Sequence, residues 1–182
     1  LCADAAPSFL RFFDLSIAPT LLYYAYIPVV IISLILGLFI FIKDKRSLVS
    51  KLFLGISILF SLWVINIIVQ WVAVPTSLVH FSWQLTGILE VPIFLLSVYF
   101  VSVFAKQQDI SLKSKLLLSL FYFVVLFFTP AAYNIPSFNL ADCQGNVGLL
   151  WKYIYALELF CVFWIGFIAI KSYKNLQSNS DN

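Results

Sequence analysis

The sequence contains little charge. Only 10% of its 182 residues are Asp, Glu, Lys or Arg, whereas 63% are hydrophobic. A soluble domain carries about 25% charged residues, because the part of its surface that stays in water must be polar. The composition therefore excludes a soluble globule and an intrinsically disordered chain, and it indicates an integral membrane protein.

Cysteine and methionine are scarce as well. Three cysteines are too few for a disulfide-rich secreted module, and methionine is absent. Because the chain lacks methionine and begins at Leu1, we expect it to be a piece of a longer polypeptide. Cys2 and Cys143 fall on the side that we expect to face outward, where a disulfide between them can form, whereas Cys161 falls in the membrane. With only two candidates, the bridged and the free state both stay open.

Motifs that carry chemistry are missing. The sequence has no metal-ligand spacing, Gly-rich phosphate loop, nucleophile elbow or catalytic triad. We therefore expect this chain to have no catalytic activity, no cofactor and no bound metal. Its net charge of +3 is accounted for by short loops between apolar segments, so the sequence predicts no nucleic-acid partner.

What is abundant is long apolar runs. A helix needs about 20 residues to cross the roughly 30 Å hydrocarbon core of a bilayer. Five segments reach or approach this length, at residues 21–42, 52–74, 78–105, 114–133 and 148–170. The fourth is the weakest of them, because its uninterrupted apolar part ends at Thr129, before Pro130. Open strands are excluded, since unpaired backbone finds no partner in lipid. The predicted fold is an all-α polytopic membrane bundle of about five helices.

The charges predict its orientation. Cytoplasmic loops of membrane proteins are enriched in Lys and Arg. Nine of the eleven cations fall on one side of the five segments: Lys43, Lys45, Arg46, Lys51, Lys106, Lys113, Lys115, Lys171 and Lys174. The other two are Arg11 and Lys152. We therefore expect residues 1–20 to be extracytoplasmic or interfacial, residues 21–173 to form the transmembrane domain, and residues 174–182 to be a cytoplasmic tail or a truncated connector. The basic loops should favour anionic headgroups of the lipid bilayer.

Two carboxyl groups lie deep in the predicted spans. Glu90 falls about 18 Å from the outer end of the third helix, and Glu158 about 15 Å along the fifth. Ionisable residues inside a membrane are costly and often functional. Other polar and aromatic side chains share the middle or outer half of the second, third and fifth helices: Asn66, Gln70, His80, Trp83, Gln84, Lys152 and Tyr155.

These residues permit two interpretations. In one, they line an outward-open pocket between the second, third and fifth helices that accepts a small polar ligand. In the other, they hydrogen-bond across helices and hold the bundle together without any ligand. His80 lies near the interface, where a solvated or capping role competes with a sensing role.

The second and third segments resemble a known family. Residues 47–71 read SLVSKLFLGISILFSLWVINIIVQW, and residues 80–106 read HFSWQLTGILEVPIFLLSVYFVSVFAK. They are similar to the N-terminal seven-helix sensor region of bacterial histidine kinases and some diguanylate cyclases. The positions that carry the resemblance are Lys51, Leu52, Phe53, Trp63, Trp83, Gly87, Pro92, Phe94 and Phe104. It covers about residues 20–172, but five helices are visible where the family has seven, and no output module follows.

The resemblance implies a sensory input domain of a two-component-type signalling protein in the inner (plasma) membrane. Its expected partner is a cytoplasmic kinase or other output domain, in cis or in trans, and kinases of this class act as homodimers. Two alternatives stay open. One is a small transporter or channel subunit that uses Glu90 and Glu158 as a proton or cation relay. The other is a membrane scaffold without a small ligand.

Overall fold

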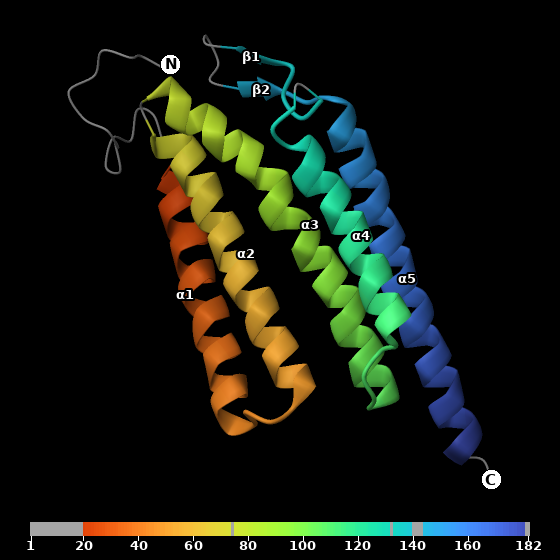
Figure 1. The fold of residues 1–182 in the computed structure, drawn as a ribbon. Coiled ribbons are helices and arrows are strands. Elements are labelled where there is room, and N and C mark those ends of the chain that lie inside the picture. The colour runs from red at the N-terminus through yellow and green to blue at the C-terminus, as the bar shows by residue number, and fades with distance from the viewer. Residues whose placement is uncertain (1–19, 74, 132, 140–143, 181–182) are drawn as a thin grey trace.

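The computed structural model describes residues 20–73, 75–131, 133–139 and 144–180 (Figure 1). These residues form a helical bundle with a short β-hairpin at one end, so the predicted helical fold is confirmed. The elements are α1 (Thr20–Lys43), α2 (Leu48–Val72), α3 (Thr76–Lys106), α4 (Leu112–Phe128), β1 (Ser137–Asn139), β2 (Gln144–Asn146) and α5 (Leu149–Ser180).

Four of the described helices are long and apolar enough to cross a membrane: α1, α2, α3 and α5. The fourth helix is shorter than we expected, because it ends at Phe128 and not at residue 133. The Thr129 hydroxyl donates to the Val125 carbonyl, and Pro130 then has no N–H with which to continue the ladder. With 17 residues, α4 is about 26 Å long.

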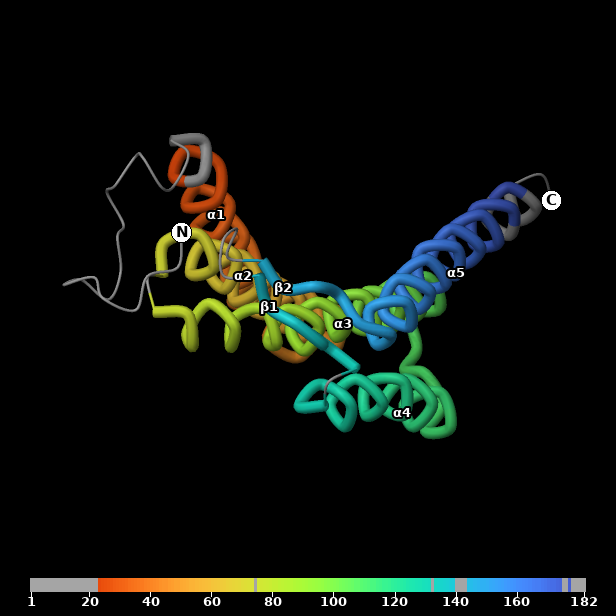
Figure 2. The backbone as a smooth tube through the Cα atoms, turned by 90° about the horizontal axis from the view of Figure 1, so that it is seen from above, coloured from red at the N-terminus to blue at the C-terminus, as the bar shows by residue number. Residues whose placement is uncertain are grey.

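Helix α3 is the centre of the bundle. It packs against α2 on one side and α5 on the other, while α1 packs against α2 (Figure 2). Helix α4 contacts α3 and α5 less extensively and lies apart from α1 and α2 in both ribbon views. Helix α3 therefore joins the α1–α2 pair to α5, and α4 lies against α3 apart from most of α5.

Small residues let α1 and α2 approach closely. A Cβ atom on Gly37 would lie 2.7 Å from both Cβ and Oγ of Ser57. Ser33 Oγ donates to the Ser57 carbonyl at 3.4 Å, and Ser61 is buried one turn further along α2. The weak small-residue patterns at Ser33–Gly37 and Ser57–Ser61 thus form a helix interface within one chain, as is common in membranes.

A second close approach joins α3 to α5. A Cβ atom on Gly87 would lie 2.7 Å from Ile154 Cδ1. Around and below this contact, the core consists of buried apolar side chains of α3, α4 and α5: Val91, Leu95, Val98, Val125, Leu150, Trp151, Ile154, Leu157 and Cys161. Because α3 and α5 run in the same direction, residues at equal spacing from Gly87 and Ile154 lie at equal depth.

The hairpin closes the end of the bundle where α3 and α5 begin. Ser137 pairs with Asn146 and Asn139 with Gln144, in an antiparallel register. The buried Asn134 side chain donates to the carbonyls of Thr129 and Gln84, at 3.3 and 3.4 Å. This amide ties the end of α4 to α3, a contact that no pattern in the sequence indicates.

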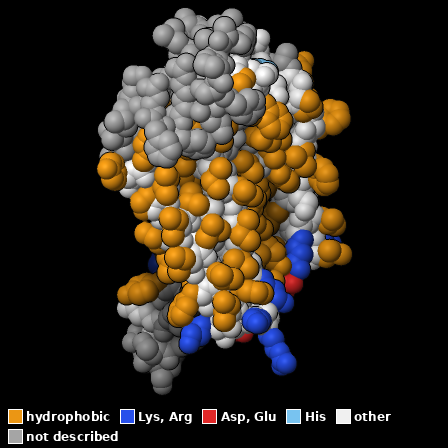
Figure 3. All heavy atoms as spheres, turned by 90° about the vertical axis from the view of Figure 1, so that its left-hand side faces the viewer, with side chains coloured by type: hydrophobic (Ala, Val, Ile, Leu, Met, Phe, Trp, Pro, Cys, Tyr) orange, Lys and Arg blue, Asp and Glu red, His pale blue; other side chains and the backbone are white. Residues whose placement is uncertain are grey.

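The cations gather at the opposite end. Helix α1 ends at Lys43 and α3 at Lys106, and α4 begins beside Lys113, all at the end of the bundle where the chain terminates (Figure 1). The space-filling view of the α1 side has an apolar middle band, with Lys and Arg side chains gathered below it (Figure 3). We call this the basic end and the other the hairpin end. Helix α5 continues past Lys171 to Ser180, beyond the predicted end at residue 170.

Candidate functional site

The two deep carboxyl groups lie at the same level of the bundle. Glu90 follows Gly87 by three residues on α3, and Glu158 follows Ile154 by four on α5. Glu90 and Glu158 therefore both lie about 5–6 Å from the Gly87–Ile154 contact, measured along the helices towards the basic end. They are close enough to interact electrostatically, and both are partly buried. The structure thus brings together the two residues that the sequence singled out on separate helices.

Polar atoms around this pair lack partners. The Trp63 indole of α2 lies beside the Glu90 carboxyl, but its Nε1 is buried without a hydrogen bond of normal geometry. Glu158 Oε1 and Trp151 Nε1 are also buried without a partner among the described residues. A buried polar atom without a hydrogen bond costs about 1–3 kcal/mol. Trp63 Nε1 beside Glu90, and Glu158 Oε1 on α5, are therefore left to pair with a further polar group, whereas Trp151 Nε1 lies about two turns nearer the hairpin end.

The amides of the second helix serve a different purpose. Asn66 Nδ2 donates to the Ser82 carbonyl at 2.9 Å and to Thr86 Oγ1 at 3.2 Å. Gln70 Nε2 makes the same two contacts, at 3.2 and 2.8 Å. Both amides thus bind α3 directly, which is the interhelical role that we weighed against ligand binding.

The remaining candidates are spread along the hairpin end. The His80 ring meets Phe138 of β1 edge-on at 5.5 Å, and Trp83 packs under Gly145 of β2. The Tyr155 ring is tilted against that of Trp151, with ring centroids 5.6 Å apart, and Tyr155 is itself exposed. The side chains of the last two candidates, Gln84 and Lys152, form no hydrogen bond or ion pair with the residues that the structure describes. None of these five residues has a described contact with Glu90.

The described cysteine and acidic residues do not gather at one place. Cys161 is a buried free thiol, while Cys2 and Cys143 lie outside the described residues, as does their suggested bridge. The described part of the chain contains no group of three His, Cys, Asp or Glu side chains that could hold a metal ion.

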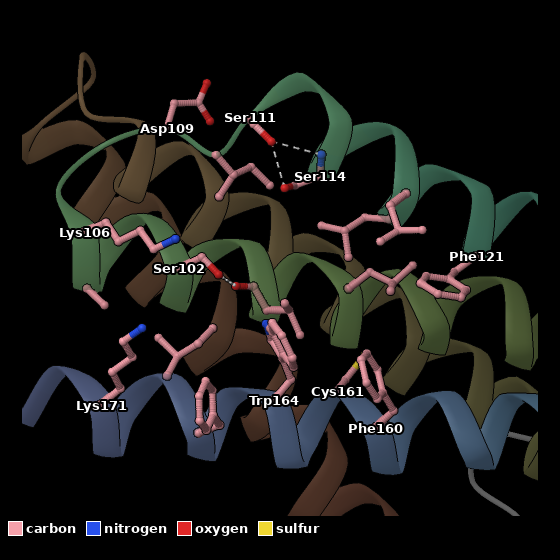
Figure 4. A pocket seen from close by; sticks show the side chains of 18 of the residues that line it. Ser102, Lys106, Asp109, Ser111, Ser114, Phe121, Phe160, Cys161, Trp164 and Lys171 are labelled. Carbon is pink, nitrogen blue, oxygen red and sulfur yellow. Dashed lines mark hydrogen bonds between the residues drawn. The ribbon is translucent and has the colours of Figure 1, made fainter.

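A cavity lies elsewhere than the predicted outward-open pocket. A space of about 750 Å³ opens at the basic end between α3, α4 and α5 (Figure 4). Its lining includes none of the nine residues predicted for the pocket. Sequence reasoning missed this cavity, because its walls consist mainly of lysines, serines and apolar side chains, with Gln108 and Asp109, and each of these is ordinary at the end of a membrane helix.

Sequence reasoning also missed the two indoles. Trp63 counted only among the residues that carry the family resemblance, and Trp151 read as an interfacial aromatic on one face with Glu158, which is a usual role of Trp in membrane proteins. Only the register between helices places Trp63 beside Glu90. The available signal was the helical spacing of Trp151 and Glu158, which are seven residues apart and therefore on one face.

Comparison with known proteins leaves the chain without an assigned family. No family model, no curated protein and no solved structure matches it.

Proposed function

We propose that this chain is a membrane-embedded sensory input domain whose switch is the Glu90–Glu158 pair. In this proposal an extracytoplasmic or membrane signal changes the charge or the contacts of the pair. The change moves α5 relative to α3 and is read by a cytoplasmic output domain, in cis or in trans. The signal must bind one arrangement of the helices better than the other, since a ligand shifts an equilibrium only by its differential affinity.

The observation that carries this proposal is the length of α5. The helix has 32 residues and is about 48 Å long, whereas the hydrocarbon core is about 30 Å thick. Glu158 lies on this helix near its contact with α3, and the same helix continues past Lys171 and Lys174 at the basic end. A rigid element thus joins the carboxyl pair to the region beyond the basic end, which is what transmission by a helix shift requires.

The proposal includes five spans and an inward C-terminus. Helix α4 connects the basic end to the hairpin end, and its 17 residues cover about 26 Å, so modest thinning of the bilayer suffices for it to cross. The cations at the basic end favour a cytoplasmic location for that end, in the inner (plasma) membrane. The resemblance to the sensor region of bacterial histidine kinases supports the same interpretation, and a homodimer fits it.

The experiment uses the full chain in lipid nanodiscs with protons as the probe. Spin labels are placed at Lys51 of α2 and Lys174 of α5, both exposed, after the native cysteines are replaced by serine. We expect the distance distribution between the labels to differ between pH 5 and pH 8. The double variant Glu90→Gln/Glu158→Gln should give one distribution at both pH values, because neither side chain can change its charge.

Asp109→Asn is the matched control. It removes an exposed acid outside the Glu90–Glu158 pair, so the distance between the labels should still change between pH 5 and pH 8. An unchanged distribution in the unmodified chain would contradict the switch. So would a pH response that survives in the double Gln variant.

The second candidate is a proton or cation relay, and the equal depth of the two carboxyls favours it. A relay predicts flux across proteoliposomes that Glu90→Gln abolishes. Absence of flux with both the unmodified chain and the variant, together with the distance change above, would retain the sensor and eliminate the relay.

A further inference from the structure

We propose that the cavity between α3, α4 and α5 is a binding site for one anionic phospholipid of the leaflet at the basic end. The headgroup would lie against Lys106 and Lys171, and an acyl chain would extend into the bundle between α4 and α5. This site is separate from the Glu90–Glu158 pair, and it does not depend on the proposed sensory function.

The cavity is polar at one end only. Lys106 of α3 and Lys171 of α5 reach into the same opening from facing helices (Figure 4). Serine hydroxyls accompany them along the polar part of the lining: Ser102, Ser111, Ser114 and Ser172. Neither lysine forms an ion pair within the described residues, so two cations share one opening and no described acid is bound to either of them.

The acid in the cavity lining, Asp109, does not neutralise the two lysines. Asp109 lines the cavity too, but its carboxylate is turned away from Lys106 and Lys171 in Figure 4. Its carboxylate binds the Lys115 ammonium and accepts a hydrogen bond from the Tyr99 hydroxyl at 2.6 Å. These two contacts, that of Lys115 first, hold the pKa of Asp109 below its usual value. The carboxylate is thus already engaged, and the charge free to act at the opening is positive.

The rest of the cavity is apolar and points into the membrane. Its far end is lined by Leu95 of α3, Phe121 of α4 and Leu157 of α5. Leu95 lies eleven residues from Lys106 and Leu157 fourteen from Lys171, which corresponds to about 16 and 21 Å along the helices. Half of a bilayer core is about 15 Å thick. The cavity therefore has the polarity and length of one lipid leaflet.

The volume and the packing fit such an occupant. At about 750 Å³ the cavity lies within the roughly 300–1,000 Å³ range of small-molecule sites. Helix α4 packs loosely against α5, so the opening has a lateral entrance from the bilayer. Basic pockets between membrane helices bind lipid headgroups by this charge complementarity.

The test counts lipids retained on the detergent-solubilised full chain by native mass spectrometry. The probes are phosphatidylglycerol, phosphatidylcholine with the same acyl chains, and inorganic phosphate. We expect one phosphatidylglycerol to be retained in preference to phosphatidylcholine. Lys106→Gln/Lys171→Gln should weaken its binding about tenfold to thirtyfold, the effect of removing two cations near a headgroup. Lys45→Gln/Lys51→Gln, which removes two exposed cations outside the cavity, should leave it unchanged.

A second pair of variants tests the apolar part. Ala105 lines the cavity, so Ala105→Trp should fill it and reduce retention with both lysines in place. Ala169→Trp, on the exposed face of α5, is its control. Ala105→Leu provides a smaller obstruction if the Trp variant does not fold, as judged by circular dichroism.

Three results would overturn the proposal. The first is equal retention of the anionic and zwitterionic lipids. The second is equal loss of phosphatidylglycerol in the cavity variants and their controls. The third is lysine-dependent binding of inorganic phosphate that Ala105→Trp leaves unchanged, which would indicate an anion site without an acyl chain.

Discussion

Individual polar side chains in this bundle divide into two kinds. Asn66 and Gln70 have their hydrogen-bonding partners within the protein, at Ser82 and Thr86 of the neighbouring helix. Trp63, Trp151 and Glu158 have buried polar atoms without such partners. The first kind needs no ligand to explain its presence in a membrane. Residues of the second kind have polar atoms left over, and these atoms could bind a signal molecule, a proton or a cation.

This division predicts different costs for two amide deletions. Asn66→Ala should lower the free energy of unfolding by about 0.6–2 kcal/mol, because Ser82 and Thr86 lose one of their donors. Gln84→Ala is the matched control, since that amide forms no bond to the described residues, and it should change stability by less than about 0.5 kcal/mol. Unfolding in mixed micelles, followed by circular dichroism, measures both. Equal effects would contradict the assignment of Asn66 to the α2–α3 interface.

At the scale of elements, close packing depends on where small residues lie on a helix. Gly37 lies against Ser57, and Gly87 against Ile154, whereas Gly166 of α5 has nothing within 4 Å of its would-be Cβ. The sequence shows all three as glycines in apolar runs. Only the pairing of helices separates those that permit contact from the one that faces outward.

This difference predicts opposite results for one substitution. Gly37→Ala should lower the free energy of unfolding by about 1–3 kcal/mol, because the new methyl group would overlap the Ser57 side chain close to its backbone. Gly166→Ala should be neutral or slightly stabilising, since alanine favours a helix over glycine by about 1 kcal/mol. Thermal unfolding in detergent compares the two. A neutral Gly37→Ala would mean that α1 and α2 are separated more widely.

The helix bounds also show how much of the fold the apolar pattern of the sequence predicts. Apolar runs predicted α1, α2 and α3 to within a few residues, because length and hydropathy decide whether a helix can span lipid. They overestimated α4, where Pro130 ends the ladder, and underestimated α5, whose last turns are polar. The hairpin was missed, since three-residue strands leave no periodic signal.

At the scale of the whole molecule, the count of spans and the orientation decide which surfaces meet which compartment. Lys113 at the start of α4 and Gln144 in β2 lie at opposite ends of that helix. If α4 crosses the membrane, single cysteines at these positions face opposite sides.

We expect Lys113→Cys to react with an impermeant thiol reagent only in inverted membrane vesicles, and Gln144→Cys only in spheroplasts. Both are made in a chain whose native cysteines are replaced by serine. Lys174→Cys, which lies on the side of Lys113, is the control for orientation. Labelling of Lys113→Cys and Gln144→Cys from the same side would show that α4 does not cross.

The sequence by itself determined the class of this protein. Scarce charge, long apolar runs and one-sided cations specify a helical membrane protein, because a bilayer rejects exposed polar backbone and charge whatever the tertiary arrangement. It also singled out Glu90 and Glu158 by depth alone. Tertiary structure decided what surrounds them. The register set by Gly87 and Ile154 brings the two carboxyls to one level, assigns Asn66 and Gln70 to the α2–α3 interface, and leaves the cavity between α3, α4 and α5 at the basic end. These outcomes depend on rotations and offsets between helices, which packing fixes and hydropathy does not encode.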